Sequence, residues 1–304
     1  MDVSEIPGFR VGQARSREAA TGCTVVISER GAVCGVDVSG GSPGTRDTAA
    51  LDPVMNRKLT HAVLLTGGSS FGLDAAGGVM RFLEERGIGR DVGVTVVPNV
   101  AAAVLFDLKV GGWDARPDAA MGYAACGNAF SGAPFARGQH GAGTGCAVGK
   151  CMGMARSSRG GVGSSVLRHG GLTVGAVAAV NCVGDVVRDG GIIAGLRGED
   201  GGFADSESAI LEAYLNETDF FSENTVLACV MTNARLDKAQ ATRLARCGQN
   251  GIARCIRPAH SVYDGDTVFA MCSGELRATL DSVCILAARA VESAIYDAVT
   301  EATA

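Results

Sequence analysis

The chain has 304 residues, of which 47% are hydrophobic, 19% charged and only 5% aromatic, and 44 of them are glycines. This composition is typical of a globular protein with many tight turns. The net charge of −5 offers no basic patch, which argues against nucleic acid as a partner. No uncharged apolar run reaches the length of a membrane span, so we expect no membrane partner either.

Eleven cysteines are spread along the chain, and most lie in apolar runs, where cysteine behaves as a small hydrophobic residue. They form no C-x-x-C pair and share no ligand spacing with the four histidines, so we expect neither a metal nor another cofactor. The N-terminus lacks the basic and apolar segments of a signal peptide. We therefore expect reduced thiols and a cytoplasmic location.

Short apolar runs alternate with amphipathic stretches, and the chain has no repeats and no low-complexity linker. The predicted elements are, in order, a hairpin at residues 22–39 that turns at 29–31, a glycine-rich loop at 40–48, a strand at 62–66, a helix at 73–86, a strand at 94–97, a helix at 118–128, a buried strand at 172–180, a surface loop at 199–207, a strand at 226–231, and helices at 236–256 and 275–299. Because strands and helices alternate, we expect one domain with a layered α/β architecture, in which helices cover buried sheets.

Two glycine-rich segments invite comparison with nucleotide-binding loops. Residues 67–72 join a strand to a helix, but their spacing fits neither G-x-G-x-x-G nor a P-loop, and no lysine follows the glycines. A P-loop ending at Lys150 would need glycine where Thr144 stands, and serine or threonine where Cys151 stands. We therefore reject a kinase or NTPase role and interpret residues 67–72 as a tight turn.

Two acidic loops run directly into apolar strands and together form a candidate site. Residues 216–222 are predicted to be an exposed loop, and Thr225 follows them at the start of a strand. Asp264 and Asp266 flank Gly265 at the start of another strand. A threonine at such a junction is usually structural. However, a threonine and two carboxylates delivered by adjacent strand ends could meet at one edge of a sheet.

Both junctions, in this order, resemble those of the self-cleaving aminopeptidases and nylon-oligomer hydrolases of the DmpA/ornithine-acetyltransferase superfamily. The resemblance covers nearly the whole chain and includes residues 35–46 (GVDVSGGSPGTR), 65–74 (LTGGSSFGLD), 141–145 (GAGTG) and 264–267 (DGDT). It implies a layered αββα-type sandwich. It also implies a chain of residues 1–304 that cuts itself into residues 1–224 and 225–304 and forms a homo-oligomer, a tetramer of processed heterodimers.

The resemblance assigns roles residue by residue. Thr225 matches the nucleophile, and the Asn224-Thr225 pair matches the cleavage site of the nylon-hydrolase branch, whereas the aminopeptidase branch is cut between glycine and serine. Asp264 and Asp266 match two residues that hold the amino and hydroxyl groups of the nucleophile. Lys150 matches a lysine beside the nucleophile, where its charge would depress the pKa of the freed amine.

The resemblance also bears on how the reaction's oxyanion is stabilised. Asn181, which follows the buried run at 172–180, matches the side chain that donates to the oxyanion. Phe106 stands where relatives have a tyrosine that assists, so the second donor is left open, with Tyr123 as an alternative. His260 is expected to structure the turn that leads to Asp264.

An N-terminal threonine carries its own base, an α-amino group with a pKa of about 7.7–8.0, close to working pH. This base becomes free only after the bond before Thr225 is broken. In the family, the same hydroxyl attacks the preceding carbonyl, here that of Asn224, and gives an ester that water hydrolyses. The new ammonium would also separate the charges of Asp264 and Asp266. One residue would thus perform maturation and turnover.

We therefore expect a hydrolase that cleaves amide or peptide bonds in small-molecule or short-peptide substrates with a free amine, either an aminopeptidase or an amino-oligomer amidase. One alternative is an acyltransferase of the ornithine-acetyltransferase type that uses the same threonine. Another is a non-catalytic binding protein on this scaffold, whose chain would stay uncut. A Ser–His–Asp hydrolase is not expected, because no G-x-S-x-G elbow occurs.

Overall fold

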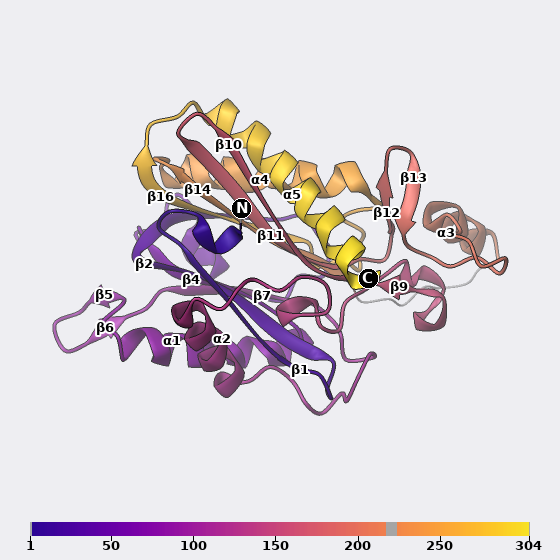
Figure 1. Ribbon diagram of the computed structural model, residues 1–304, viewed down its shortest axis with the longest axis horizontal. Helices are drawn as coiled ribbons and strands as arrows, with labels where there is room; N and C mark the ends of the chain where they lie inside the picture. Colours follow the sequence, from indigo (N-terminus) through magenta and orange to yellow (C-terminus); the bar gives the residue numbers. More distant parts are fainter. Residues whose placement is uncertain (1, 217–223, 304) are drawn as a thin grey trace.

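A long mixed sheet forms the framework of the molecule (Figure 1), in a computed structural model that describes residues 2–216 and 224–303. Its strands are, in spatial order, β10 (Gly161–His169), β11 (Leu172–Asn181), β14 (Thr225–Ala234), β16 (Thr267–Leu276), β2 (Thr21–Val38), β4 (Thr60–Thr66), β7 (Val100–Val104) and β3 (Thr45–Arg46), with β1 (Arg10–Ser16) also paired to β2. Apart from Asn216, the loop predicted at residues 216–222 lies outside the described residues.

Five helices and several short elements complete the described chain. The helices are α1 (Ala75–Glu84), α2 (Ala119–Ser131), α3 (Ser206–Leu215), α4 (Lys238–Cys255) and α5 (Leu280–Thr303). Short sheets are formed by β5 (Arg90–Asp91) with β6 (Val96–Val97), by β8 (Ala147–Val148) with β9 (Ser158–Arg159), and by β12 (Asp185–Arg188) with β13 (Gly191–Ala194) and β15 (Ile256–Arg257). The 3-10 turns are η1 (Val3–Glu5), η2 (Thr48–Leu51), η3 (Ser69–Asp74), η4 (Gly141–Gly143), η5 (Lys150–Met152) and η6 (Met154–Arg156).

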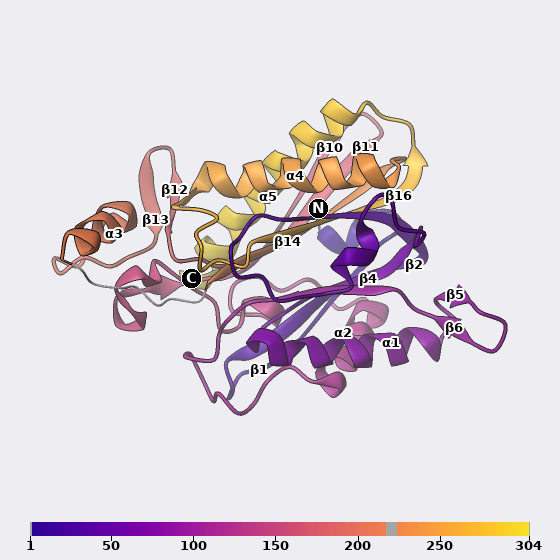
Figure 2. The ribbon, with the colours of Figure 1, turned by 180° about the vertical axis from the view of Figure 1, so that it is seen from behind.

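Alternation along the strands divides the apolar side chains among three cores. In β14, Val226 and Ala228 pack in the core beneath α4 and α5, whereas Leu227 and Cys229 pack in the core between the two halves of the sheet. β4 and β7 divide in the same way between the inter-sheet core and the core over α1 and α2. Figures 1 and 2 show the resulting layers, with α4 and α5 on one side and α1 and α2 on the other. The predicted αββα sandwich is confirmed.

β2 is one bent strand that belongs to both halves of the sheet. Its residues 23–27 pair with β4 and its residues 33–38 pair with β16. Between them Glu29 and Arg30 are exposed, and Gly31 has a positive φ of 74°, which glycine adopts at little steric cost. The predicted hairpin at residues 22–39 is therefore wrong, because its supposed turn is a bend between two pairings. The actual hairpin joins β1 to β2.

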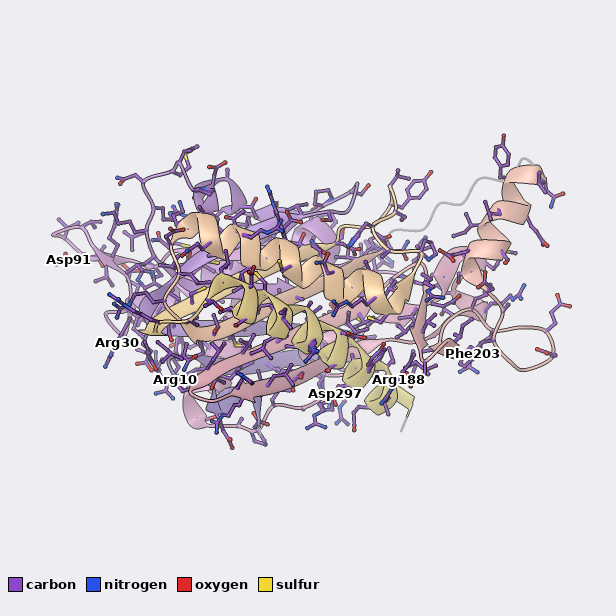
Figure 3. The ribbon with its side chains drawn as sticks, turned by 90° about the horizontal axis from the view of Figure 1, so that it is seen from above. Arg10, Arg30, Asp91, Arg188, Phe203 and Asp297 are labelled. Atoms are coloured by element: carbon purple, nitrogen blue, oxygen red, sulfur yellow. The ribbon has the colours of Figure 1, made fainter. Side chains whose placement is uncertain are left out.

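Local sequence determines where several helices begin. The side chain of Asp118 accepts the Met121 N–H at 2.9 Å and caps α2, at the start of the helix predicted for residues 118–128. Asp237 and Gln240 form a capping box that opens α4. In the layer of α4 and α5, seen from above in Figure 3, Asp297 of α5 accepts the Ser164 N–H of β10 at 2.9 Å and so ties helix to sheet.

Three predicted boundaries move. The strand predicted at residues 94–97 is reduced to β6 in a partly exposed ribbon, and the buried strand is β7 instead. Strand propensity alone does not distinguish an exposed ribbon from a buried strand. The loop predicted at 199–207 ends where α3 begins, and the last helix begins after β16 has run to Leu276. Among the described residues, no helix has the length and apolar character that a membrane span requires.

Candidate active site

Thr225 lies where β14 begins, at one end of the space between the two halves of the sheet. Because side chains alternate along a strand, Thr225 points the same way as Leu227, which packs in the inter-sheet core. Asn181, the last residue of β11, is the direct cross-strand partner of Thr225. The two residues are only 4% and 1% exposed. Since β14 and β16 run parallel, the acidic loop before β16 reaches the same edge, as predicted.

The peptide bond between Asn224 and Thr225 is held firmly by its surroundings. Gly265 N–H donates to the Asn224 carbonyl oxygen at 2.9 Å, and Asn224 N–H donates to the Tyr263 carbonyl at 3.2 Å. The Thr225 hydroxyl donates to that same Asn224 oxygen. A Cβ at position 265 would lie 2.7 Å from Thr225 Oγ1, so only glycine lets the hydroxyl stay there.

Asp266 is buried, and both of its carboxylate oxygens are hydrogen-bonded. Oδ1 accepts the Val226 N–H at 2.7 Å, directly after Thr225 in the chain. Oδ2 accepts from His260 twice, from its backbone N–H at 3.1 Å and from Nδ1 at 2.8 Å. Asp266 therefore fixes the start of β14 to the turn that contains His260.

Asp264 is also buried, but only half of its carboxylate is hydrogen-bonded. Oδ2 accepts the Ser261 N–H at 2.8 Å, whereas Oδ1 has no hydrogen-bond partner among the described residues. Burial, with the charge of Asp266 added, raises the pKa of Asp264 to about 6, although Ser261 and the charge of Lys150 act in the opposite direction. Asp264 thus brings an unused acceptor to the site.

Lys150 begins the η5 turn and is 5% exposed. Burial lowers the pKa of Lys150 to about 8, although the nearby carboxylates of Asp264 and Asp107 act in the opposite direction. The structure therefore brings the predicted lysine into the same buried cluster as Asp264. Among the described residues, no group of three or more His, Cys, Asp or Glu side chains could hold a metal ion.

Asn181 is locked in one orientation by two backbone groups. Its Oδ1 accepts the Ala147 N–H at 3.0 Å, and its Nδ2 donates to the Phe106 carbonyl at 2.8 Å. An amide nitrogen has two hydrogens, so the second N–H, which no described residue accepts, is available to a ligand. Phe106 contributes its backbone carbonyl to the site, and its ring lies 5.6 Å from Lys109 Nζ.

Tyr123 does not replace the missing tyrosine. It lies on α2, its hydroxyl donates to Glu85 at 2.6 Å, and its ring packs edge-on against Phe82. This places it in the outer layer, on the far side of a sheet half from the inter-sheet core that Thr225 faces. Tyr123 as an alternative donor is therefore wrong. Helical packing against α1 explains its position.

The sequence did not indicate Asp107 as a site residue. Both of its carboxylate oxygens are used: Oδ2 accepts the Thr21 hydroxyl at 2.6 Å, and Oδ1 accepts the Gly68 N–H at 2.7 Å. Burial raises the pKa of Asp107 despite these bonds. Asp107 directly follows Phe106, whose carbonyl holds Asn181. Its position directly after Phe106, where relatives have the assisting tyrosine, is the signal that could have found it.

The chain matches a known peptidase family over nearly its whole length. The model of peptidase family S58 matches residues 2–304. An uncharacterized aminopeptidase of Mycobacterium leprae (strain TN) is 41% identical over 295 residues, which cover 91% of this chain and 80% of the relative. A 6-aminohexanoate-oligomer endohydrolase of Kocuria sp. (strain KY2) is 32% identical over 278 residues, which cover 90% of this chain and 75% of the relative.

Two solved structures share the fold. One is an L-aminopeptidase D-Ala-esterase/amidase from Ochrobactrum anthropi, described as a variant of the Ntn hydrolase fold, with a TM-score of 0.74, 20% identity, and coverage of 99% of this chain and 86% of that one. The other is a Burkholderia sp. β-aminopeptidase with a TM-score of 0.67, 22% identity, and coverage of 98% and 85%. The resemblance noted in the sequence is thus confirmed. The chain belongs to peptidase family S58 and is a hydrolase of amide bonds.

Proposed function

We propose that Thr225 is the nucleophile of this hydrolase and that the chain first cuts its own Asn224–Thr225 bond. The observation that carries the proposal is the position of the buried Thr225 hydroxyl, which donates to the Asn224 carbonyl oxygen and so lies beside the carbon it would attack. The hydroxyl oxygen bonds to that carbon, the C–N bond breaks, and the nitrogen takes up a proton. Water then hydrolyses the ester to give residues 1–224 and 225–304.

The backbone N–H of Gly265 is our proposed second oxyanion donor. It lies 2.9 Å from the Asn224 carbonyl oxygen, which carries the negative charge when the hydroxyl attacks. In turnover, the carbonyl of a substrate would take the place of the Asn224 carbonyl. The spare N–H of Asn181 is the proposed first donor. One preorganised donor of this kind lowers the barrier by about 2.7–4 kcal/mol.

Cleavage would turn the Thr225 nitrogen from an amide into an amine that can act as the general base. Asp264 Oδ1, buried and without a partner among the described residues, supports a role as acceptor for this amine. The charge of Lys150 would favour the neutral, basic form of the amine at working pH. Asp266 would accept the adjacent Val226 N–H and so keep the amine of Thr225 in a fixed position.

The proposed substrates are short peptides or amino-acid oligomers with a free amine. This follows the relatives, whose names describe aminopeptidases and 6-aminohexanoate-oligomer endohydrolases. We favour aminopeptidase activity because the mycobacterial aminopeptidase is more similar to this chain than the oligomer endohydrolase is. Adding an acceptor amino acid to the assay tests acyl transfer, since a transferase would then form a new amide.

We also propose that the protein works in the cytoplasm as a homo-oligomer of processed chains. All eleven cysteines are free thiols, which suits a reducing compartment. Light scattering of the purified protein measures the oligomeric state. A monomer at all concentrations would contradict that part of the proposal.

Intact mass and activity of two Thr225 variants test the central proposal. Thr225→Ala removes one hydroxyl at a cost of about 1 kcal/mol, too little to unfold a chain of this size. It should be folded, uncut and inactive against aminoacyl anilides, whereas Thr225→Ser should still be cut. Retained hydrolysis by a folded, uncut Ala variant would mean that Thr225 is only structural.

A further inference from the structure

His260 contacts the candidate site from a side that the proposed mechanism does not use. It lies in the turn between β15 and β16, and its Nδ1 is 2.8 Å from Asp266 Oδ2. The His260 side chain is 23% exposed and that of Asp266 only 2%. An ionised carboxylate only accepts hydrogen bonds, so the histidine must donate from Nδ1. The sequence identified the turn but not this contact.

The contact forms one chain of hydrogen bonds that ends beside the nucleophile. His260 donates to Asp266 Oδ2, and Asp266 Oδ1 accepts the N–H of Val226, the residue after Thr225. His260 has a φ of 57°, a left-handed conformation that is uncommon for residues other than glycine. The backbone N–H of His260 donates to the same Asp266 oxygen and fixes this conformation.

The charges around His260 are mainly negative. Asp266 and Asp264 face it from its own loop, and Asp37 acts on it from β2. Arg246 of α4 lies 3.2 Å from Asp37, and Lys150 acts on Asp264. In the uncut chain the Thr225 nitrogen is a neutral amide, so no ammonium is yet present to balance the two carboxylates.

We propose that His260 is a positioning residue: its imidazole orients Asp266 toward the Val226 N–H and, when protonated, places a positive charge beside the carboxylates of Asp266 and Asp264. The inference rests on the proposed function of Thr225. Burial alone would lower the pKa of His260, but the hydrogen bond and charge of Asp266, with the charges of Asp264 and Asp37, outweigh it and raise the pKa. His260 would act in both maturation and turnover, because both use the start of β14.

Three substitutions separate the hydrogen bond, the charge and the backbone shape. His260→Asn keeps a donor near the place of Nδ1 and tolerates a left-handed backbone, but it cannot be protonated. His260→Gly fits the backbone and has no donor. His260→Ala has neither property.

The readout is the pH profile of kcat/KM for the processed enzyme. At the plateau, the Gly and Ala variants should lose about 10- to 100-fold, whereas the Asn variant should stay within about threefold of wild type. In all three, the acid limb should move to higher pH by about half a unit or more, since Asp264, whose charge acts on His260, has lost a neighbouring cation. A Gly variant with wild-type activity, or an acid limb that does not move, would overturn the proposal.

A measurement on the uncut chain separates this inference from the proposed function. In the Thr225→Ala chain, NMR can follow the imidazole signals of the four histidines during a pH titration. Adding Asp266→Asn should lower the pKa of His260 and leave the other three unchanged. An unchanged His260 pKa would overturn the pairing even where Thr225 proves to be the nucleophile. An active Thr225→Ala chain would instead refute the proposed function alone.

Discussion

Asp107 and Asp264 are buried carboxylates at strand ends, one in each half of the sheet, and they differ in how completely they are hydrogen-bonded. Asp107 uses both oxygens, one for the Thr21 hydroxyl and one for the Gly68 N–H. Asp264 uses one oxygen, for the Ser261 N–H, and leaves Oδ1 without a partner among the described residues. Burial raises the pKa of both carboxyls.

This difference in hydrogen bonding distinguishes a carboxylate that stabilises the fold from one that could take part in a reaction. Asp185 resembles Asp107, since it accepts the Leu196 N–H and both the N–H and hydroxyl of Ser206. A buried acceptor without a partner costs stability, so its presence calls for an explanation, and a catalytic role is one. The comparison therefore assigns Asp107 and Asp185 to loop anchoring and supports a chemical role for Asp264.

Replacing the two aspartates by asparagine is the sharpest test of this comparison and has the largest expected effect. Asp264→Asn should slow self-cleavage and hydrolysis by about 100- to 10,000-fold, since it removes the charge beside the nitrogen of Thr225, the proposed nucleophile. In the uncut Thr225→Ala chain it should leave the melting temperature unchanged or raised. In wild type, cleavage should fall as pH drops through about 6, where Asp264 takes up a proton.

The matched variant is Asp107→Asn, which disturbs two satisfied hydrogen bonds. It should lower the free energy of unfolding by about 1–3 kcal/mol and change the activity of the processed enzyme by less than about tenfold. Cleavage rates from intact mass, and melting curves in the Thr225→Ala background, give both numbers. A greater loss of activity in Asp107→Asn than in Asp264→Asn would contradict these assignments.

Two asparagines of the same sheet half provide a second comparison with a smaller effect. Asn181→Ala should reduce kcat by about 100- to 1,000-fold, because the proposed oxyanion donor is lost. Asn233 at the opposite end of the sheet also accepts a backbone N–H, from Thr173, and donates to a backbone carbonyl, that of Gly171. Asn233→Ala should thus cost similar stability but leave kcat unchanged. Equal losses of kcat would assign Asn181 to structure.

The sequence predicted the strands and helices best where the pattern was local and regular. The buried run at 172–180 became β11, and the capped segment at 118–128 became α2. β2 was misread because its bend depends on two partners that are distant in sequence, β4 and β16. A local turn signal such as Glu29-Arg30-Gly31 does not show whether the chain reverses or continues into a second pairing.

For the candidate site, motifs pointed to Thr225, Asp264 and Asp266, but not to what surrounds them. The Thr21–Asp107 bond joins residues 86 positions apart, and no pattern within either segment announces it. The fixed amide of Asn181 depends likewise on backbone groups of Phe106 and Ala147, whose placement follows from the fold. The types of residue at the candidate site could therefore be predicted from the sequence. Which of their atoms already form hydrogen bonds is visible only in the tertiary structure.

The smallest expected effect concerns Lys150, a buried residue on which the charges of both Asp107 and Asp264 act. Its pKa in the folded chain, about 8, is below its usual 10.5, so the unfolded chain binds the proton more tightly. Stability should therefore rise with pH from about 8 toward 10.5, by a few degrees in melting temperature. Lys150→Met should abolish this rise.

Melting curves of the Thr225→Ala chain with and without Lys150→Met, at pH 7 to 10, measure this difference. The Thr225→Ala background keeps both samples in one piece, so self-cleavage does not affect the melting temperature. Burial raises the pKa of the Cys146 and Cys182 thiols beyond this range, and the thiols are the same in both samples, so the difference isolates the lysine. A difference independent of pH would mean that Lys150 keeps an ordinary pKa, because the attraction of Asp107 and Asp264 offsets its burial.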